Sequence, residues 1–458
     1  MNTRAGERIM ANVYVVHCVD TEGPLNESLE ATFQRIFQIT GVDLEPSIDT
    51  LKKLQNKEIF LDGKEDLIAE IFSQRLLSYN KDWTELDRML DRITSNDFRK
   101  KHPDSDGNGW KYTWFIMDHV DYEINPRNKI TGYNAIWDHY MEYYRLNHLY
   151  DDEFQWHVHP SSVYKEGNKC GSSYWNSPHI AQSLAHRLID RGFFPSAFRP
   201  GYHTERPDSH WFLEQYIPYD YANQAVEGMD LSEKQEDISG GRFGDWRRAP
   251  YDWDWYHPSH DDYQTKGSCR RVIFRCLNIG TRLRLLTQQE VDKAFERSEN
   301  GKDTVLAFCN HDFREMSNDI DDVYRLLQKA EKKYPNVRWS YSTAFEAAKR
   351  VLGHKGDNIG LRAEFKITND YRKCISIETA VDCFGPQPFF AVKMRSGEYR
   401  QENLDVQVPF RRWTYVFDDD SIHPDDVLKV GIALNSRNGS GELLVISPEN
   451  EIIINKKW

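Results

Sequence analysis

Four short apolar runs, each ending in polar side chains, constrain the fold of this chain more than any other feature. They occupy residues 13–23, 151–160, 197–203 and 305–312. Apolar runs of this length are typical of buried strands, and the segments just after buried strands often carry functional groups. A chain that repeats this pattern four times is expected to bring its polar strand ends to one place.

Two of the four strand ends carry candidate metal ligands. Successive residues of a strand point to opposite faces, so His157 and His159 share one face, and Asp20 and Glu22 share another. Taken singly, a His-x-His pair is more often a hydrogen-bonded pair than a metal site, and an Asp-x-Glu pair is a weaker indication still. Together they offer two nitrogen donors and one or two carboxylate oxygens, which suits zinc or another borderline divalent ion.

The other two runs end in Arg199-Pro-Gly-Tyr202 and in Asn310-His311. In this order the four strand ends resemble the motifs of the NodB-type polysaccharide deacetylases, which are carbohydrate esterases. The resemblance covers roughly residues 11 to 350. It implies a distorted (β/α) barrel with a single metal site at the carboxyl ends of its strands.

The resemblance also implies a role for each polar strand end. Asp20 is the expected general base, and Arg199 holds its carboxylate in place and ionised. His311 is the expected acid for the leaving amine, and a backbone N–H near Tyr202 is expected to stabilise the oxyanion. The ion would lower the pKa of a bound water to about 7 and polarise the amide carbonyl. Its implied ligands are Glu22, His157 and His159.

The sequence departs from the family pattern at two motifs. One residue separates His157 from His159, where the family usually has three. The family's Arg-x-Pro-aromatic-Gly order is Arg199-Pro-Gly-Tyr-His here, so the oxyanion donor is either Tyr202 or a neighbour. The sequence also leaves open whether Asp20 or Glu22 is the metal ligand.

A cluster of aromatic and acidic residues at 249–257 is the candidate sugar-binding surface. Trp253 and Trp255 offer ring faces on which a pyranose can stack, and Asp252 and Asp254 can bind its hydroxyls. One of these two carboxylates is also the expected orienting partner of His311. The alternative is a half-buried loop in which the rings simply pack.

The length of 458 residues, of which 39% are hydrophobic, is sufficient for two domains. Helical periodicity predicts an insertion at about 25–150 that caps the barrel mouth. The polar segment 229–243 is predicted to be a loop, either near the site or, as is slightly favoured, a solvated connection without function. Beyond Gly353 the pattern changes to alternating apolar and polar residues. We therefore predict an α/β fold: a distorted (β/α) barrel over residues 1–354 with a helical insertion, followed by a β-sandwich over residues 355–458.

The composition limits the cellular compartment and the classes of partner that we expect for this protein. The seven cysteines include no Cys-x-x-Cys pair, as expected for free thiols in a reducing compartment. No apolar run approaches the roughly 18 residues of a membrane span, and the first residues are polar. A net charge of -13 disfavours binding to nucleic acid. A cytoplasmic protein with no transmembrane segment and no nucleic-acid partner is expected; the oligomeric state is not predicted.

The predicted function is a metal-dependent hydrolase that removes an N-acyl group, foremost acetyl, from an amino sugar or a glycan precursor. One alternative keeps the fold and changes the acyl group to formyl or the substrate to another amide. A second alternative is a carbohydrate-binding protein that has lost catalysis. Retention of Asp20, Arg199 and His311 together argues against the second, because binding alone needs no base, orienting cation or acid.

Overall fold

A computed structural model describes residues 11–171, 173–177, 179–228 and 244–458. The predicted loop 229–243 lies outside the described residues. The described strands form one parallel sheet and two antiparallel sheets. Among the described helices, none is long and apolar enough to cross a membrane.

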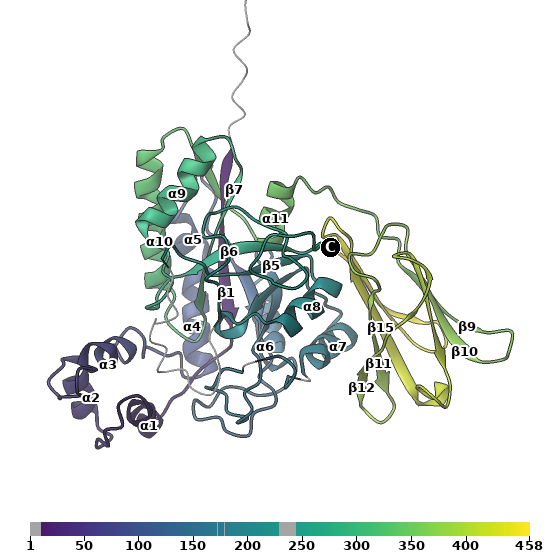
Figure 1. Cartoon of the computed structure of the whole chain (residues 1–458), viewed down its shortest axis with the longest axis horizontal. Coiled ribbons are helices and arrows are strands. Elements are labelled where there is room, and N and C mark those ends of the chain that lie inside the picture. Colours follow the sequence, from purple (N-terminus) through teal and green to yellow (C-terminus); the bar gives the residue numbers. More distant parts are fainter. Residues whose placement is uncertain (1–10, 172, 178, 229–243) are drawn as a thin grey trace, which may run out of the picture.

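Strand pairing closes the parallel sheet into a barrel. Figure 1 labels four of its strands, β1, β5, β6 and β7, with helices around them. β1 pairs with β7 along its length and with β2 near its carboxyl end, so seven strands complete the circle. β8 pairs with the beginning of β1 and lies outside the closure. The prediction of a barrel is therefore confirmed. Its strands are β1 (Asn12–Thr21), β2 (Thr113–Ile116), β3 (Glu153–Val158), β4 (Ala197–Pro200), β5 (Tyr219–Asn223), β6 (Val272–Asn278), β7 (Thr304–His311) and β8 (Arg338–Tyr341).

Alternate residues of the barrel strands fill its interior. On β1 the interior residues Tyr14, Val16 and Cys18 belong to one buried cluster, and on β7 the cluster includes Ala307 and Cys309. Helix α11 (Ala344–Leu352) adds three buried alanines to the same cluster, at the end where β1 begins. The period of two then carries Asp20 and His311 onto the opposite, carboxyl end of this core.

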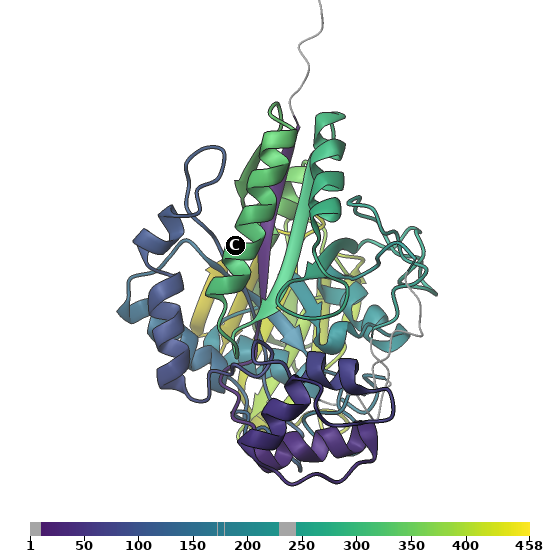
Figure 2. The same ribbon diagram turned by 90° about the vertical axis from the view of Figure 1, so that its left-hand side faces the viewer.

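The helices divide between the barrel wall and a separate small unit. Helices α4 and α6 share the large core outside the barrel with α9 and α10, so they pack as wall helices and do not cap the mouth. Helices α1, α2 and α3 form a separate group, seen at the bottom of Figure 2. They have a core of their own, which includes Phe33, Ile36 and Ile68. The bounds are α1 (Leu29–Thr40), α2 (Ile48–Gln55), α3 (Glu65–Ile71), α4 (Trp83–Ile93), α5 (Asn96–Lys100), α6 (Ala135–Leu146), α7 (His179–Arg191), α8 (Pro207–Tyr216), α9 (Gln288–Glu299) and α10 (Ser317–Lys333).

Local sequence explains where several helices begin and end. The Ser28 hydroxyl accepts a hydrogen bond from the Ala31 N–H at the start of α1, and Gly41 ends this helix with φ of 72°. Thr343 and Glu346 form a reciprocal capping box at the start of α11. Side-chain caps and a left-handed glycine thus define these helix ends locally.

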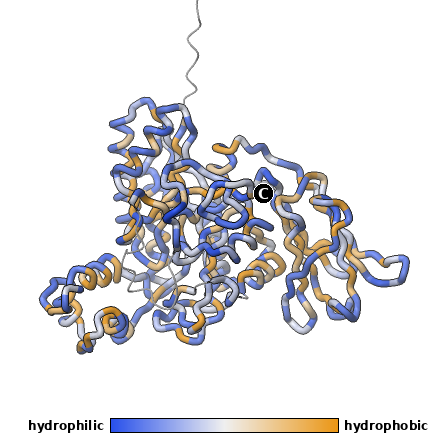
Figure 3. The backbone as a smooth tube through the Cα atoms, in the orientation of Figure 1, coloured by the Kyte–Doolittle hydropathy of each residue, from blue (hydrophilic) through white to orange (hydrophobic). Residues whose placement is uncertain are grey.

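The antiparallel strands after α11 form two sheets that pack face to face. One sheet has the order β13-β14-β10-β9 and the other β12-β11-β15-β16-β17. Their shared core includes Trp413 and Ile375 from the first sheet and Phe390 and Ile432 from the second, and hydrophobic residues recur along these strands in Figure 3. The strands are β9 (Arg362–Ile367), β10 (Lys373–Glu378), β11 (Phe389–Met394), β12 (Tyr399–Gln401), β13 (Asp405–Val408), β14 (Arg412–Phe417), β15 (Val427–Asn435), β16 (Gly441–Ile446) and β17 (Ile452–Lys457).

The outer face of the five-stranded sheet packs on the barrel helices α7 and α8. Leu184 and Leu188 of α7 share a buried cluster with Phe389, Ala433 and Leu443 of the sheet. This sheet therefore has both faces covered, which accounts for the nearly continuous burial along β15 and β16.

Candidate metal and catalytic site

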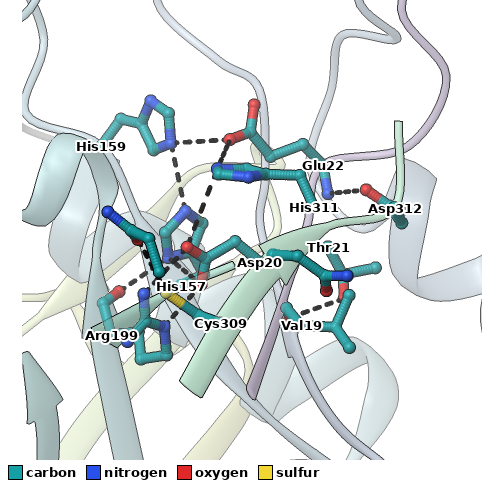
Figure 4. A network of polar contacts seen from close by, with 12 residues as sticks. Val19, Asp20, Thr21, Glu22, His157, His159, Arg199, Cys309, His311 and Asp312 are labelled. Atoms are coloured by element: carbon teal, nitrogen blue, oxygen red, sulfur yellow. Dashed lines mark hydrogen bonds and ion pairs between the residues drawn. The ribbon is translucent and has the colours of Figure 1, made fainter. Parts of the chain in front are cut away.

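Strand register brings the polar strand ends together. Asp20 of β1 lies beside His311 of β7, and His157 of β3 lies beside Arg199 of β4. Parallel strands end at the same edge, so all four side chains gather at the carboxyl end of the barrel. Glu22 and His159 follow two residues after Asp20 and His157 and join the group, as Figure 4 shows.

One group of three buried side chains has the spacing of a metal site. The Nε2 atoms of His157 and His159 lie 3.1 Å apart, and His159 Nε2 lies 3.3 Å from Glu22 Oε1. The donor atoms of all three residues lie within 4.8 Å of one another. These residues could therefore hold a metal ion.

The hydrogen bonding of His157 also fits a metal. His157 Nδ1 donates to the Arg199 carbonyl at 2.8 Å, which leaves the Nε2 lone pair directed into the group. Burial lowers the pKa of His157 to about 4, so its ring is neutral near pH 7. His159 Nδ1 is buried and has no hydrogen-bond partner among the described residues, so the interactions of His159 are concentrated on Nε2.

Neighbouring residues hold both the backbone and the side chain of Glu22 in place. Its N–H donates to Asp312 Oδ1 at 2.8 Å, and His119 Nε2 contacts its carbonyl oxygen at 2.8 Å. Its Oε2 accepts a hydrogen bond from Lys129 Nζ at 2.7 Å, while Oε1 faces His159. Burial would raise the pKa of the Glu22 carboxyl, but Lys129 and His159 hold it well below its usual range. Glu22 is thus ionised, with one oxygen fixed and the other available.

Asp20 is bound by Arg199 through both carboxylate oxygens. Arg199 Nε donates to Oδ1 at 2.6 Å and Nη2 donates to Oδ2 at 3.0 Å, while Nη1 donates to the Tyr221 carbonyl at 2.6 Å. Burial would raise the pKa of Asp20, but this guanidinium keeps it well below its usual range. Each carboxylate oxygen retains a lone pair that can accept a proton.

Asp20 also belongs to a second buried group, with His203 and Cys309. Burial raises the pKa of the Cys309 thiol well above its ordinary value, which disfavours the thiolate that a metal requires. Since Arg199 already engages both oxygens of Asp20, the donor chemistry favours the group of Glu22, His157 and His159.

His311 lies between the two carboxylates. Its Nε2 is 3.8 Å from Asp20 Oδ2 and 3.9 Å from Glu22 Oε1. Burial lowers the pKa of His311 to about 4, although both carboxylates act in the opposite direction. The imidazole is therefore neutral near pH 7 in the metal-free protein, and it must gain a proton before it can donate one.

The segment after β4 approaches His159 closely. A Cβ at Gly201 would lie 1.8 Å from His159 Cδ2, so this position requires glycine. Tyr202 follows with φ of 52°, and its ring centroid lies 4.7 Å from that of His159. Left-handed backbone at a tyrosine is uncommon, and it places Tyr202 in the wall of the site.

The predicted sugar platform does not reach this site. Trp253 is buried against α9 and donates to the Glu290 carbonyl at 2.8 Å, and Asp254 forms an ion pair with Arg297. Asp252 is exposed, and Trp255 packs near the beginnings of β5 and β6. The predicted platform is corrected accordingly: an antiparallel pairing of Tyr256 with Ile273 holds this segment along the barrel wall. His311 is flanked by Asp20 and Glu22 and not by the predicted Asp252 or Asp254.

A cavity of about 210 Å³ opens over the candidate metal-binding group of Glu22, His157 and His159. Asp20, Glu22, His159 and His311 form its floor. Walls come from the α1–α3 unit and from the segments after β2, β4, β6 and β7, represented by Arg35, Ile71, Arg127, Tyr202, Arg282 and Arg314.

Two buried residues that position Glu22 have no role in the sequence-based prediction. Lys129 follows a turn with no apolar run to mark it, so no local pattern indicates its contact with Glu22. Asp312 directly follows His311, and an acidic residue next to the last residue of a strand could have indicated a site residue. Its two oxygens accept the N–H groups of Glu22 and Gly23, at 2.8 Å and 2.9 Å.

No protein-family model matches the sequence, and no curated protein matches it significantly. Assignment to a family therefore depends on the order of the motifs and on the site geometry.

Proposed function

We propose that this protein is a metal-dependent amide hydrolase of the NodB-type deacetylase kind, which removes an acetyl group from an amino sugar. The observation that carries the proposal is the convergence at one barrel end of a Glu-His-His donor group and an Asp-Arg pair, with His311 beside both. Two histidines and one carboxylate with open positions are a typical catalytic zinc set. Such an ion supplies an activated water and polarises a carbonyl.

The protein side chains supply proton transfer and orientation. Asp20 is ionised and rigidly held, so it can accept the proton of the attacking water. Its Oδ2 is 3.8 Å from His311 Nε2, a separation that a small shift of either side chain closes. His311, neutral at rest, receives a proton during the reaction and returns it to the departing amine. Arg199 keeps Asp20 in its reactive rotamer throughout.

Metal content and product release test the proposal together. The purified protein is expected to contain about one divalent ion per chain, and His159→Ala is expected to lose it. The metal-loaded wild type should release acetate from N-acetylated amino sugars. Release of formate from the corresponding N-formyl sugars alone would favour a deformylase. Absence of metal in the wild type after incubation with zinc would overturn the proposal.

A further inference from the structure

Cationic side chains outnumber carboxylates among the described residues that line the cavity above the proposed metal-binding group. These residues include five cationic side chains and two carboxylates. Both carboxylates already have cations of their own, since Asp20 pairs with Arg199 and Glu22 with Lys129. Of the other described cations of the lining, the argument uses Arg35, Arg127 and Arg314.

Two of these arginines share one carboxylate. Arg35 donates to both oxygens of Glu27, at 2.7 Å and 2.8 Å, and Arg127 donates to the same Glu27 at 3.2 Å. Glu27 is almost completely buried, so it neutralises one charge of the two. The network also ties α1 to the segment that carries Lys129.

Arg314 contributes a charge that the described carboxylates do not pair. Its guanidinium lies 5.3 Å from the centroid of the Phe313 ring, and it forms no ion pair within the described part of the chain. Burial lowers the pKa of Arg314, which means that its charged form is poorly solvated. A partly buried cation of this kind is stabilised by an anion that enters the cavity.

The charge of this cavity lining differs in sign from the net charge of the whole chain. The whole chain has a net charge of -13, which repels small anions at long range. Arginines collected in one cavity favour the binding of an anion there. Guanidinium groups match the oxygens of phosphate in a two-pronged manner.

We propose that Arg314, Arg127 and Arg35 form an anion subsite that binds the phosphate of a glycosyl phosphate, so that the substrate of the adjacent metal site is a phosphorylated N-acetyl amino sugar. This inference rests on the proposed function for the identity of the sugar, but not for the anion subsite itself. The group that the subsite would recognise is a phosphoester on the sugar. A simple sugar phosphate, a nucleotide sugar and a lipid diphosphate sugar all carry this group.

Calorimetric titration of the metal-loaded protein tests the subsite without requiring turnover. The probes are N-acetylglucosamine, its 1-phosphate and its uridine diphosphate ester. Arg314→Met should weaken binding of both phosphorylated sugars about 10- to 100-fold and leave the uncharged sugar unaffected. Arg314→Lys should give an intermediate loss, because it keeps the charge and loses the two-pronged geometry. Arg325→Met is the matched control, since Arg325 is exposed on α10 and pairs with Asp322.

The outcomes separate the subsite from the proposed hydrolase. A loss of phosphoester affinity in His159→Ala but none in either Arg314 variant would assign phosphate to the metal and overturn the subsite. Tighter binding of a sugar carboxylate than of the phosphoesters would overturn the choice of phosphate. Binding of phosphoesters that depends on Arg314, without acetate release, would retain the subsite and reject the hydrolase. Tighter binding of the uridine diphosphate ester would identify a nucleotide sugar as the substrate, and tighter binding of the monophosphate would identify a simple sugar phosphate. A short-chain prenyl diphosphate sugar, titrated in the same way, tests for a lipid-linked substrate.

Discussion

Replacing Lys129 with methionine should destabilise the metal-free protein and tighten its binding of a divalent ion. Lys129 Nζ contacts Glu22 Oε2 at 2.7 Å, and the two side chains are 5% and 4% exposed. Breaking a buried ion pair by removing one partner typically costs about 3–5 kcal/mol, because the other charge is left uncompensated. The free energy of unfolding of metal-free Lys129→Met should therefore fall by about this amount.

A divalent cation at Glu22, His157 and His159 would compensate the same carboxylate. Metal should then restore most of the lost stability, so its stabilising effect should be larger in the variant than in the wild type. A coupling of about 3 kcal/mol corresponds to a metal dissociation constant about 100-fold lower in Lys129→Met. Denaturant unfolding with and without zinc, together with competition against a chelator of known affinity, measures both quantities.

Lys393→Met is the matched control for this experiment. Lys393 lies in the sandwich and pairs with Asp190 at 2.9 Å, with 24% of its side chain exposed. Its replacement should cost about 1 kcal/mol or less and leave metal affinity unchanged. Weaker metal binding in Lys129→Met, or a metal-free variant as stable as the wild type, would refute the reasoning.

Three further predictions follow from the site and the barrel. Asp20→Asn should abolish acetate release while elemental mass spectrometry still finds the ion, and loss of the ion would make Asp20 a ligand. Asp312→Asn should weaken metal affinity about 10- to 100-fold by chelator competition, because an amide can accept only one of the two N–H groups of Glu22 and Gly23; unchanged affinity would mean that Asp312 does not position Glu22. Burial raises the pKa of Glu153 to about 7, so the unfolded chain ionises this group first and stability falls as pH rises from about 4.5 to 7. Denaturant titrations across this range should show Glu153→Gln with a smaller decline, by up to about 3 kcal/mol, and an identical slope would reject the assignment.

Alternation along two strands accounts for the part of the site that sequence could predict. His157 with His159, and Asp20 with Glu22, share faces in the structure because strand residues alternate. Which strands become neighbours is also readable to a degree, since a parallel α/β barrel arranges most of its strands in chain order. These two rules suffice to bring Glu22, His157 and His159 to one end of the barrel.

The two site residues that the sequence did not predict, Lys129 and Asp312, contact Glu22 from distant parts of the chain. Lys129 meets Glu22 across 107 positions of sequence, and Asp312 meets it across 290. Neither contact leaves a periodic pattern, because each residue lies in an irregular segment after a strand. The prediction for the segment around Trp253 was wrong for the opposite reason. Its composition suits a sugar-binding surface, but burial of the Trp253 ring against α9 accounts for the same composition.

Charge balance connects the metal site to the cavity above it. Without metal, each site carboxylate has its own cation, and the floor formed by Asp20 and Glu22 is close to neutral. A divalent ion adds two positive charges that no further described carboxylate of the lining offsets. The loaded pocket would therefore favour anions, both a water that has lost a proton and the phosphate of a substrate. On this reasoning the pairing of Glu22 with Lys129 would weaken metal binding, but it would also leave the loaded site with a larger net positive charge and a stronger attraction for anions.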